Sequence, residues 1–317
     1  MSTILEILKL IIGFAMLIKG ADIFVDASVE IAKRLKIPRV IIGLTIVSMG
    51  TGAPEVVIGI VASAGGASDL AAGNVLGSNI FNLLFIVGLC SIIKPVAVKF
   101  KDIARDYWIS LAAPVVLLIA MFLLGDTIPR TGGFILVTVF VLYMFALVRQ
   151  AMKGRDKARE EELDSDISPR PLIKNIIWGL LGLALIIIGA NFAVSSAESL
   201  ALTLGLSERV IGITVIAVGT SLPELVIFLI SSKKGENDMA IGVIIGSNIF
   251  NVLFVLGISG IVMPLAIDGS MKIDLGVLIL GKLAFLLFVL TGKKIIRWEG
   301  LGFVMLYVGY IAYIIMT

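Results

Sequence analysis

The sequence contains no histidine and a single cysteine, Cys90. The absence of histidine removes the side chain most often used for general acid–base catalysis, and with only one cysteine there are no Cys/His metal centres and no disulfides within the chain. No nucleophile–base pair or paired-aspartate motif takes their place. We therefore expect neither an enzyme nor a protein with a resident cofactor.

Charged residues are also scarce, at 15% of the 317 residues, whereas 59% are hydrophobic and the mean hydropathy is +1.10. No soluble domain of this size hides so much apolar surface, so the composition predicts a polytopic protein of the lipid bilayer, with no nucleic-acid partner. Hydrophobic stretches long enough to span a bilayer fall at roughly 4–32, 38–64, 69–93, 106–124, 130–150, 172–203, 208–232, 238–262, 273–291 and 298–316. We expect an all-α fold of about ten transmembrane helices.

Lysine and arginine are unevenly distributed over the connections between these stretches. If the N-terminus lies outside, the outer connections hold only Arg130, Arg209 and Lys272, and nearly all other basic residues lie on the inner side. The positive-inside rule then predicts a multi-pass protein of the cell membrane with both termini outside and the central loop in the cytoplasm.

The chain repeats itself. A constant shift that carries Gly13 onto Gly182 aligns Gly13–Pro95 with Gly182–Pro264 without a gap, and more than a third of the aligned residues are identical. Each half has about five helices, an odd number, so the second half must cross the membrane upside down. We expect two inverted five-helix repeats, at 1–152 and 172–317, joined by a cytoplasmic linker at 153–171.

Each repeat carries a short polar break inside an apolar segment. The first is Gly50-Thr51-Gly52-Ala53-Pro54-Glu55 and the second is Gly219-Thr220-Ser221-Leu222-Pro223-Glu224. A charged side chain at membrane depth costs roughly 2.5–3.5 kcal/mol even on the lenient insertion scale, which makes both glutamates candidates for a functional site. The proline removes one helical hydrogen bond, so we expect backbone carbonyls near Ser48–Thr51 to be free to face a cation.

Further oxygen-bearing side chains fall at helical spacing around these breaks. The candidates are Thr51, Glu55, Ser78 and Asn82 in the first half and Thr220, Ser221, Glu224, Ser247 and Asn251 in the second. Six to eight oxygens with two carboxylates suit calcium better than magnesium. Two carboxylates neutralise one divalent ion or two monovalent ions, so the same groups can serve competing occupants, which is the requirement for exchange.

Simpler roles are open for several of these residues. Ser78 and Ser247 are also the small residues that let helices pack closely, and Asn82 and Asn251 are also suited to hydrogen bonds between helices. Four charged residues share one face of the first helix, namely Lys19, Asp22, Asp26 and Glu30. We expect those four to form local ion pairs and not to bind ions.

The motifs G-T-[SG]-x-P-E and G-S-N-I-F-N each occur in both repeats, and by them the chain resembles the calcium:cation antiporter superfamily, specifically the prokaryotic sodium/calcium exchangers. The resemblance implies that Glu55 and Glu224 coordinate calcium beside the backbone carbonyls of Thr51 and Thr220. It also implies that sodium is held by Ser78, Ser221, Ser247 and the carbonyls of Ser48 and Ala217, with Asn82 and Asn251 lining the centre. The long first and sixth helices would slide against the helices that carry these residues.

Two residues depart from the pattern of the family. Gly52 stands where the second repeat has Ser221, which removes one hydroxyl and is expected to alter sodium affinity or stoichiometry on that side. Asn251 is neutral where potassium-dependent relatives carry an aspartate, which argues against potassium co-transport.

The sequence thus predicts a secondary transporter that exchanges sodium for calcium by alternating access, with the two ions as its partners and a monomer as the working unit. Two alternatives stay open: a proton-coupled calcium antiporter of the same superfamily, and a cation channel, which needs a continuous path and weaker binding.

Overall fold

The computed structural model describes residues 3–125, 127–161, 171–203, 217–266 and 271–316. The described residues are mainly helical. The first half contains α1 (Thr3–Leu35), α2 (Arg39–Ile42), η1 (Gly43–Val47), α3 (Ser48–Thr51), α4 (Ala53–Ala64), α5 (Ser68–Ile80), η2 (Phe81–Ile86), α6 (Val87–Ile93), α7 (Phe100–Leu124) and α8 (Arg130–Glu161). The second half contains α9 (Leu172–Thr203), α11 (Ala217–Thr220), α12 (Leu222–Lys233), α13 (Asn237–Phe250), η4 (Asn251–Val255), α14 (Leu256–Val262), α15 (Met271–Gly292) and α16 (Arg297–Met316).

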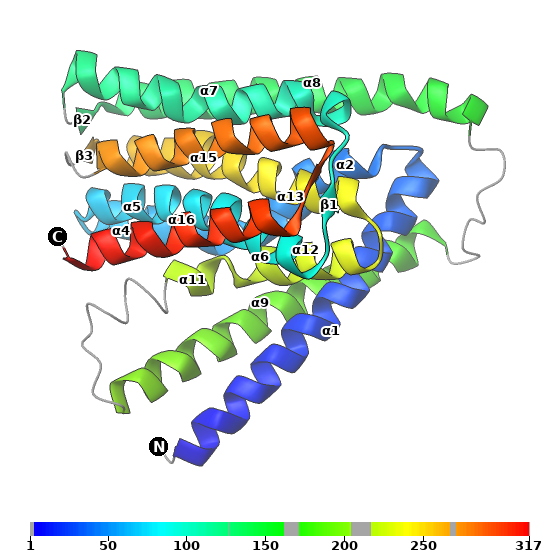
Figure 1. Ribbon diagram of the computed structural model, residues 1–317, viewed down its shortest axis with the longest axis horizontal. Coiled ribbons are helices and arrows are strands. Elements are labelled where there is room, and N and C mark those ends of the chain that lie inside the picture. The colour runs from blue at the N-terminus through cyan, green and yellow to red at the C-terminus, as the bar shows by residue number, and fades with distance from the viewer. Residues whose placement is uncertain (1–2, 126, 162–170, 204–216, 267–270, 317) are drawn as a thin grey trace.

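Most helices run side by side in one bundle (Figure 1), while α1 and α9 cross the others obliquely along one side, opposite α7 and α8. Six helices among the described residues are long and apolar enough to cross a membrane, and the bent pair Arg39–Thr51 and Ala53–Ala64 makes a seventh span if counted as one. The expectation of a mainly helical protein with several membrane-spanning segments is confirmed.

The helix that contains the first polar break is bent where the sequence predicts. The axes of Arg39–Thr51 and Ala53–Ala64 differ by 46° across Gly52. Pro54 follows in the first turn of α4, a position that proline favours because its fixed φ angle suits the start of a helix. Ser221 separates α11 from α12 in the same way, with Pro223 in the first turn. Both breaks thus start a new helix at membrane depth.

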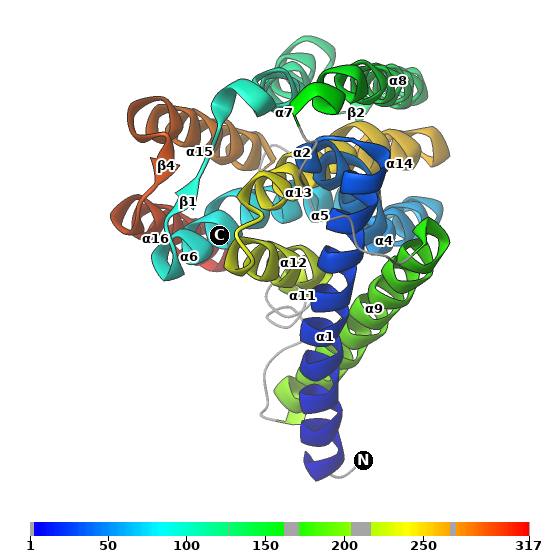
Figure 2. The same ribbon diagram turned by 90° about the vertical axis from the view of Figure 1, so that its right-hand side faces the viewer.

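Helices α5 and α13 form the middle of the bundle, with α12 beside them (Figure 2). Every residue from Met239 to Phe250 in α13 is buried. A helix that is buried all round is surrounded by other helices and not by lipid. The G-S-N-I-F-N motifs at the ends of α5 and α13 therefore lie at the centre of the molecule.

The long oblique helices α1 and α9 pack through glycines. A Cβ atom on Gly20 would lie 2.8 Å from the Gly182 carbonyl oxygen, and one on Gly182 would lie 2.8 Å from the Gly20 carbonyl oxygen. The pair Gly13 and Gly189 shows the same relation, at 2.8 and 2.7 Å. Only glycine permits this approach of two backbones, which is the usual way for helices to associate in a membrane.

These glycine contacts follow the internal repeat. Gly182 has the place in the second half that Gly13 has in the first, and Gly189 has the place of Gly20, so each contact becomes the other when the two halves are exchanged. The pairing of the short strands also follows the repeat. β1 (Val96–Ala97) pairs with β4 (Lys294–Ile295), and β2 (Thr127–Ile128) pairs with β3 (Leu265–Ala266), both antiparallel. The same alignment of the halves carries β1 onto β3.

One boundary of the expected helices falls differently. The helix α8 runs to Glu161, beyond the expected end near residue 150 and into the expected linker at 153–171. The residues that extend it are mostly alanine, arginine, lysine and glutamate, which are good helix formers, so the helix continues after the apolar stretch ends. The rest of that linker, and the start of the expected helix at 208–232, lie outside the described residues.

Candidate cation site

The two glutamates occupy equivalent places. Glu55 lies in the first turn of α4 and Glu224 in the first turn of α12, and each is only 1% exposed. The positive end of a helix dipole favours a carboxylate at this position. In the described part of the chain, neither oxygen of Glu55 and only one oxygen of Glu224 finds a hydrogen-bond partner, and the two carboxylates repel each other. A bound cation would remove both penalties.

Hydroxyl groups from both halves surround these carboxylates. Ser247 Oγ in α13 donates to Glu224 Oε1 at 3.5 Å, and the Thr51 hydroxyl, which donates to the Val47 backbone oxygen at 3.1 Å, lies close to the same carboxylate. Thr51 belongs to the first repeat and Glu224 to the second, so the two halves share one site. Ser78 Oγ and Ser221 Oγ are buried without a partner among the described residues, which leaves both available as ligands.

Four asparagines of the repeated motifs bind each other reciprocally. Asn79 Nδ2 donates to the Asn248 backbone oxygen at 3.1 Å, and Asn248 Nδ2 donates to the Asn79 backbone oxygen at 3.5 Å. Asn82 Nδ2 donates to Asn248 Oδ1 at 3.5 Å, and Asn251 Nδ2 donates to Asn79 Oδ1 at 3.2 Å. The amide nitrogens of Asn82 and Asn251 are thus occupied, and within the described chain their Oδ1 atoms are left unpaired.

Asn79 and Asn248 were not among the predicted site residues, although both belong to the repeated G-S-N-I-F-N motif. The available signal was the position of each as the first of two asparagines three residues apart, which places them on one face of a helix. The π-helical segments were overlooked as well. Asn82 lies in η2 and Asn251 begins η4, and such segments occur frequently at functional sites.

The carbonyl of Ser48 differs from expectation. It accepts the Gly52 amide hydrogen at 3.0 Å and the Thr51 hydroxyl at 3.3 Å, so it is not free. The helical bond from residue 52 to residue 48 survives because the break begins only at Gly52. The missing amide of Pro54 instead removes the helical partner of the Gly50 carbonyl. Ala217 and Thr220 begin and end α11.

The structure therefore brings the carboxylates of α4 and α12 together with oxygens of α3 and α13, and the four asparagines join α5, η2, α13 and η4. Among the described residues, no group of three or more histidine, cysteine, aspartate or glutamate side chains could hold a metal ion. In the described part of the chain, the negative charge of this region comes from Glu55 and Glu224, and the other candidate ligands are neutral oxygens. This donor set suits a hard cation.

The ring of Phe250 occupies the space beside Gly52. A Cβ atom on Gly52 would lie 2.7 Å from two ring carbons of Phe250 and 3.0 Å from the Ser48 carbonyl oxygen. Phe250 is fixed by stacking on Phe254 at a centroid distance of 5.1 Å and by an edge contact with Phe140. The missing hydroxyl at position 52 is therefore replaced by an aromatic ring from the other half, and not by an empty space.

The surroundings of α4 and of its repeat equivalent α12 differ. A cavity of about 440 Å³ lies between α4, α9 and α11, and Pro54, Val57 and Thr220 are among the residues that line it. Val57 is 60% exposed, whereas its repeat equivalent Val226 is 8% exposed and packs in one apolar cluster with Ala21 and Val25 of α1. The face of α4 toward α9 therefore borders a cavity, whereas the equivalent face of α12 is covered by α1.

Comparison with known proteins agrees with this geometry. Residues 5–149 and 174–316 match the family described as sodium/calcium exchanger protein. The chain is 40% identical to CaxA of Alkalimonas amylolytica over 95% of both chains, and 33% identical to the sodium/calcium exchanger MaX1 of Methanosarcina acetivorans over 96% of this chain and 97% of that one. A solved structure of the sodium-calcium exchanger NCX_Mj superposes with a TM-score of 0.85 at 29% identity, covering 99% of this chain and 100% of that one. The chain belongs to the sodium/calcium exchanger protein family.

Proposed function

We propose that this chain exchanges Na⁺ for Ca²⁺ across the membrane by alternating access. Proteins of its family are membrane transporters and not enzymes, and Na⁺ and Ca²⁺ are the ions that they carry. The observation that carries the proposal is the pair Glu55 and Glu224, two buried carboxylates with unpaired oxygens contributed by the two halves of the chain.

The proposed chemistry follows from charge and ligand number. Two carboxylates neutralise one Ca²⁺, with Thr51 and Thr220 beside them as further oxygen ligands. Without Ca²⁺ the same carboxylates repel each other and attract monovalent cations, for which Ser78, Ser221 and Ser247 supply hydroxyls and Asn82 and Asn251 supply amide oxygens. We propose the backbone oxygens of Ser48 and Ala217 as outer sodium ligands, although the Ser48 oxygen must then share its existing hydrogen bonds. Binding either Ca²⁺ or Na⁺ at one set of ligands makes the fluxes obligatorily opposed.

The architecture proposed for this exchange is ten transmembrane helices in two inverted repeats, at 1–152 and 172–317, with both termini outside and the α8–α9 connection in the cytoplasm. The separate family matches to the two halves and the reciprocal contacts of glycines, asparagines and strands support it. Each unit holds a complete site built from its own two halves, so we propose a monomer as the transporting species.

Alternating access would exchange the two approaches. We propose that the cavity between α4 and α9 is the open approach to the glutamates, and that the packing of α1 on α12 closes the equivalent approach. Under the proposed orientation the open approach faces outward. Movement of the α1–α9 pair across the core would close the first and open the second, because these two helices pack on each other through backbone contacts and can move together.

Transport into proteoliposomes tests the proposal. Vesicles loaded with Na⁺ and diluted into Na⁺-free medium with radioactive calcium should accumulate calcium, and equal Na⁺ on both sides should abolish the uptake. The variant Glu224→Gln should lose it, because one carboxylate cannot neutralise Ca²⁺. The exposed Asp102→Asn in the first turn of α7 is the control and should transport normally.

Two other outcomes would overturn sodium coupling. Uptake that ignores Na⁺ and follows a pH gradient would identify a proton-coupled calcium antiporter, a result that the loss of a hydroxyl at Gly52 would then explain. Uptake that needs no counter-ion gradient would identify a channel.

A further inference from the structure

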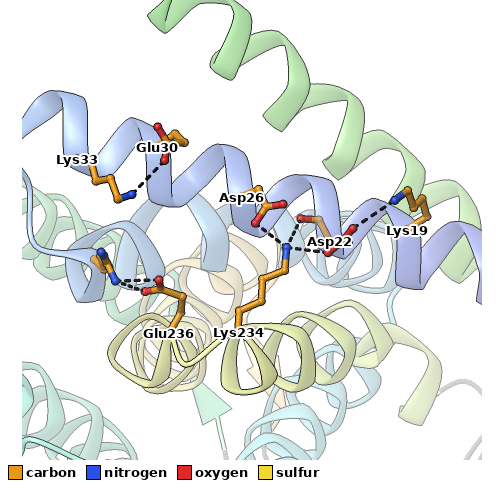
Figure 3. A network of polar contacts seen from close by, with 8 residues as sticks. Lys19, Asp22, Asp26, Glu30, Lys33, Lys234 and Glu236 are labelled. Atoms are coloured by element: carbon orange, nitrogen blue, oxygen red, sulfur yellow. Dashed lines mark hydrogen bonds and ion pairs between the residues drawn. The ribbon is translucent and has the colours of Figure 1, made fainter. Parts of the chain in front are cut away.

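The connection between α12 and α13 touches α1 through one lysine (Figure 3). Lys234 Nζ lies 2.7 Å from Asp22 Oδ1 and 2.5 Å from Asp26 Oδ1, and it also donates to the Asp22 backbone oxygen at 3.0 Å. Asp22 and Asp26 are one helical turn apart on α1, so one ammonium group bridges both. The local pairs Lys19–Asp22 and Glu30–Lys33 also form, at 3.3 and 3.2 Å, in line with the ion pairing expected for this face of α1.

The α12–α13 connection is itself fastened to the core. Arg39 at the start of α2 binds both oxygens of Glu236, at 2.7 and 2.8 Å. Lys99 before α7 pairs with Asp238 at 3.1 Å, and Lys94 Nζ donates to the Ser232 backbone oxygen at 3.2 Å. Lys234 therefore joins an anchored part of the core to the oblique helix α1.

The Lys234 side chain carries its charge at neutral pH. Partial burial lowers the pKa of the ammonium group, but the hydrogen bonds to Asp22 and Asp26 outweigh this effect and hold the pKa above its usual value. The contact is therefore an ion pair with two carboxylates and not a neutral hydrogen bond. A bridged charge of this kind is stronger than an isolated surface pair, although water still screens it.

The other repeat has no equivalent of this contact. The alignment of the two repeats places Gly65 opposite Lys234, Asn191 opposite Asp22 and Ser195 opposite Asp26. None of these three carries a charge. The contact lies on the closed approach along α1, and the open approach along α9 lacks it. The approach that the ion pairs cross is therefore also the approach that is closed.

We propose that Lys234, Asp22 and Asp26 form a latch that holds α1 on the core and biases this exchanger toward the state that is closed along α1 and open along α9. The latch rests on the proposed alternating access and deepens it. Opening the approach along α1 requires α1 to leave α12, which separates Lys234 from both aspartates. Among the described residues, no such ion pair joins α9 to the core. Lys234 is therefore a positioning residue for transport and does not bind the transported ion.

Cysteine labelling of the closed approach tests the latch. Val226→Cys in a Cys90→Ser background places one thiol under α1, where a water-soluble reagent reaches it only when that approach opens. The variant Lys234→Gln should raise the labelling rate about threefold, the size expected for a partly exposed pair of charges. Lys19→Gln is the matched control: it removes a positive charge and another partner of Asp22, but it breaks no link to the core and should leave the rate unchanged.

Two further variants distinguish loss of the latch from a general destabilisation of the protein. Lys234→Arg keeps the charge and should label at the parental rate, and Lys234→Asp combined with Asp26→Lys should restore slow labelling.

Calcium transport supplies a second measurement. Lys234→Gln should lower the apparent KM for calcium on the α1 side more than it changes kcat. Equal labelling of Lys234→Gln and Lys19→Gln would overturn the latch. Labelling needs no transport, so failure of sodium-driven uptake would count against the proposed function and not against the latch.

Discussion

The four asparagines of the repeated motifs have two different roles. Asn79 and Asn248 bind each other. Asn79 also accepts a hydrogen bond from the amide nitrogen of Asn251, and Asn248 accepts one from the amide nitrogen of Asn82. An amide whose nitrogen is fixed has its oxygen fixed as well, because the group is planar. The unpaired Oδ1 atoms of Asn82 and Asn251 are therefore pre-oriented, and cation binding need not pay for ordering these side chains.

Gly52 gives a prediction for the first repeat. Gly52→Ser should destabilise the protein by about 1–3 kcal/mol, because the new side chain overlaps the Phe250 ring. Combined with Phe250→Leu, which frees the space, the serine should supply the missing hydroxyl and tighten sodium binding severalfold. Isothermal titration of sodium into the double variant and into Phe250→Leu alone measures this. Identical isotherms for the two would show that a hydroxyl at position 52 is not a ligand.

At this scale the sequence indicated the two buried glutamates and the Ser247 hydroxyl beside Glu224, and it did not indicate how the neighbouring segments pack. Glu55 and Glu224 stand out because a carboxylate in an apolar segment is costly and because the motif occurs twice. The Ser48 carbonyl was expected to be free, but the helical hydrogen bond from Gly52 persists. The ring beside Gly52 comes from a residue of the other repeat, and no local pattern indicates such a contact between distant segments.

Among the helices, α1 and α9 are held by contacts unlike those of the core. Their backbones touch at Gly13 with Gly189 and at Gly20 with Gly182, so neither helix can rotate about its axis without a clash. Against α12, in contrast, α1 presents apolar side chains and the ion pairs of Lys234. A rigid pair with a looser contact to the core is the arrangement that a sliding movement needs.

Gly20→Ala tests this packing. The added methyl group would lie 2.8 Å from the Gly182 carbonyl oxygen, so the helices must separate, and we expect a loss of about 1–3 kcal/mol of stability. Gly276→Ala in α15 is the control, because a Cβ atom there meets nothing within 4 Å and alanine favours a helix. Thermal unfolding in detergent should show a lower Tm for Gly20→Ala only. Equal Tm values for the two variants would contradict a close backbone contact.

Helix breaks were predictable from the sequence and helix ends were less so. Glycine and proline within an apolar segment indicated the breaks at Gly52 and Ser221, and both occur. The end of α8 was placed too early, because hydrophobicity marks where a membrane segment ends and not where a helix ends. The π-helical segments η2 and η4 have no known pattern in the sequence, since they arise where packing inserts one residue into a turn.

At the scale of the whole molecule, some contacts are equivalent in the two repeats and others are not. The glycine, asparagine and strand contacts recur when the halves are exchanged, whereas the access cavity, Gly52 and the Lys234 latch do not. Two halves with identical contacts would favour both conformations equally. The unequal features therefore set which side is open, while the shared features build the site itself.

The inverted arrangement makes a prediction about the two faces of the membrane. Thr127 in β2 and Lys294 in β4 are exposed and occupy similar places in the two repeats, before α8 and α16. If the repeats are inverted with both termini outside, these residues lie on opposite sides. In a Cys90→Ser background, Thr127→Cys in intact cells should react with a maleimide that cannot cross membranes, and Lys294→Cys should react only after permeabilisation. The unmodified background controls for other thiols. Labelling of both cysteines in intact cells would place the two strands on one face, and that result is incompatible with a second repeat that crosses the membrane upside down.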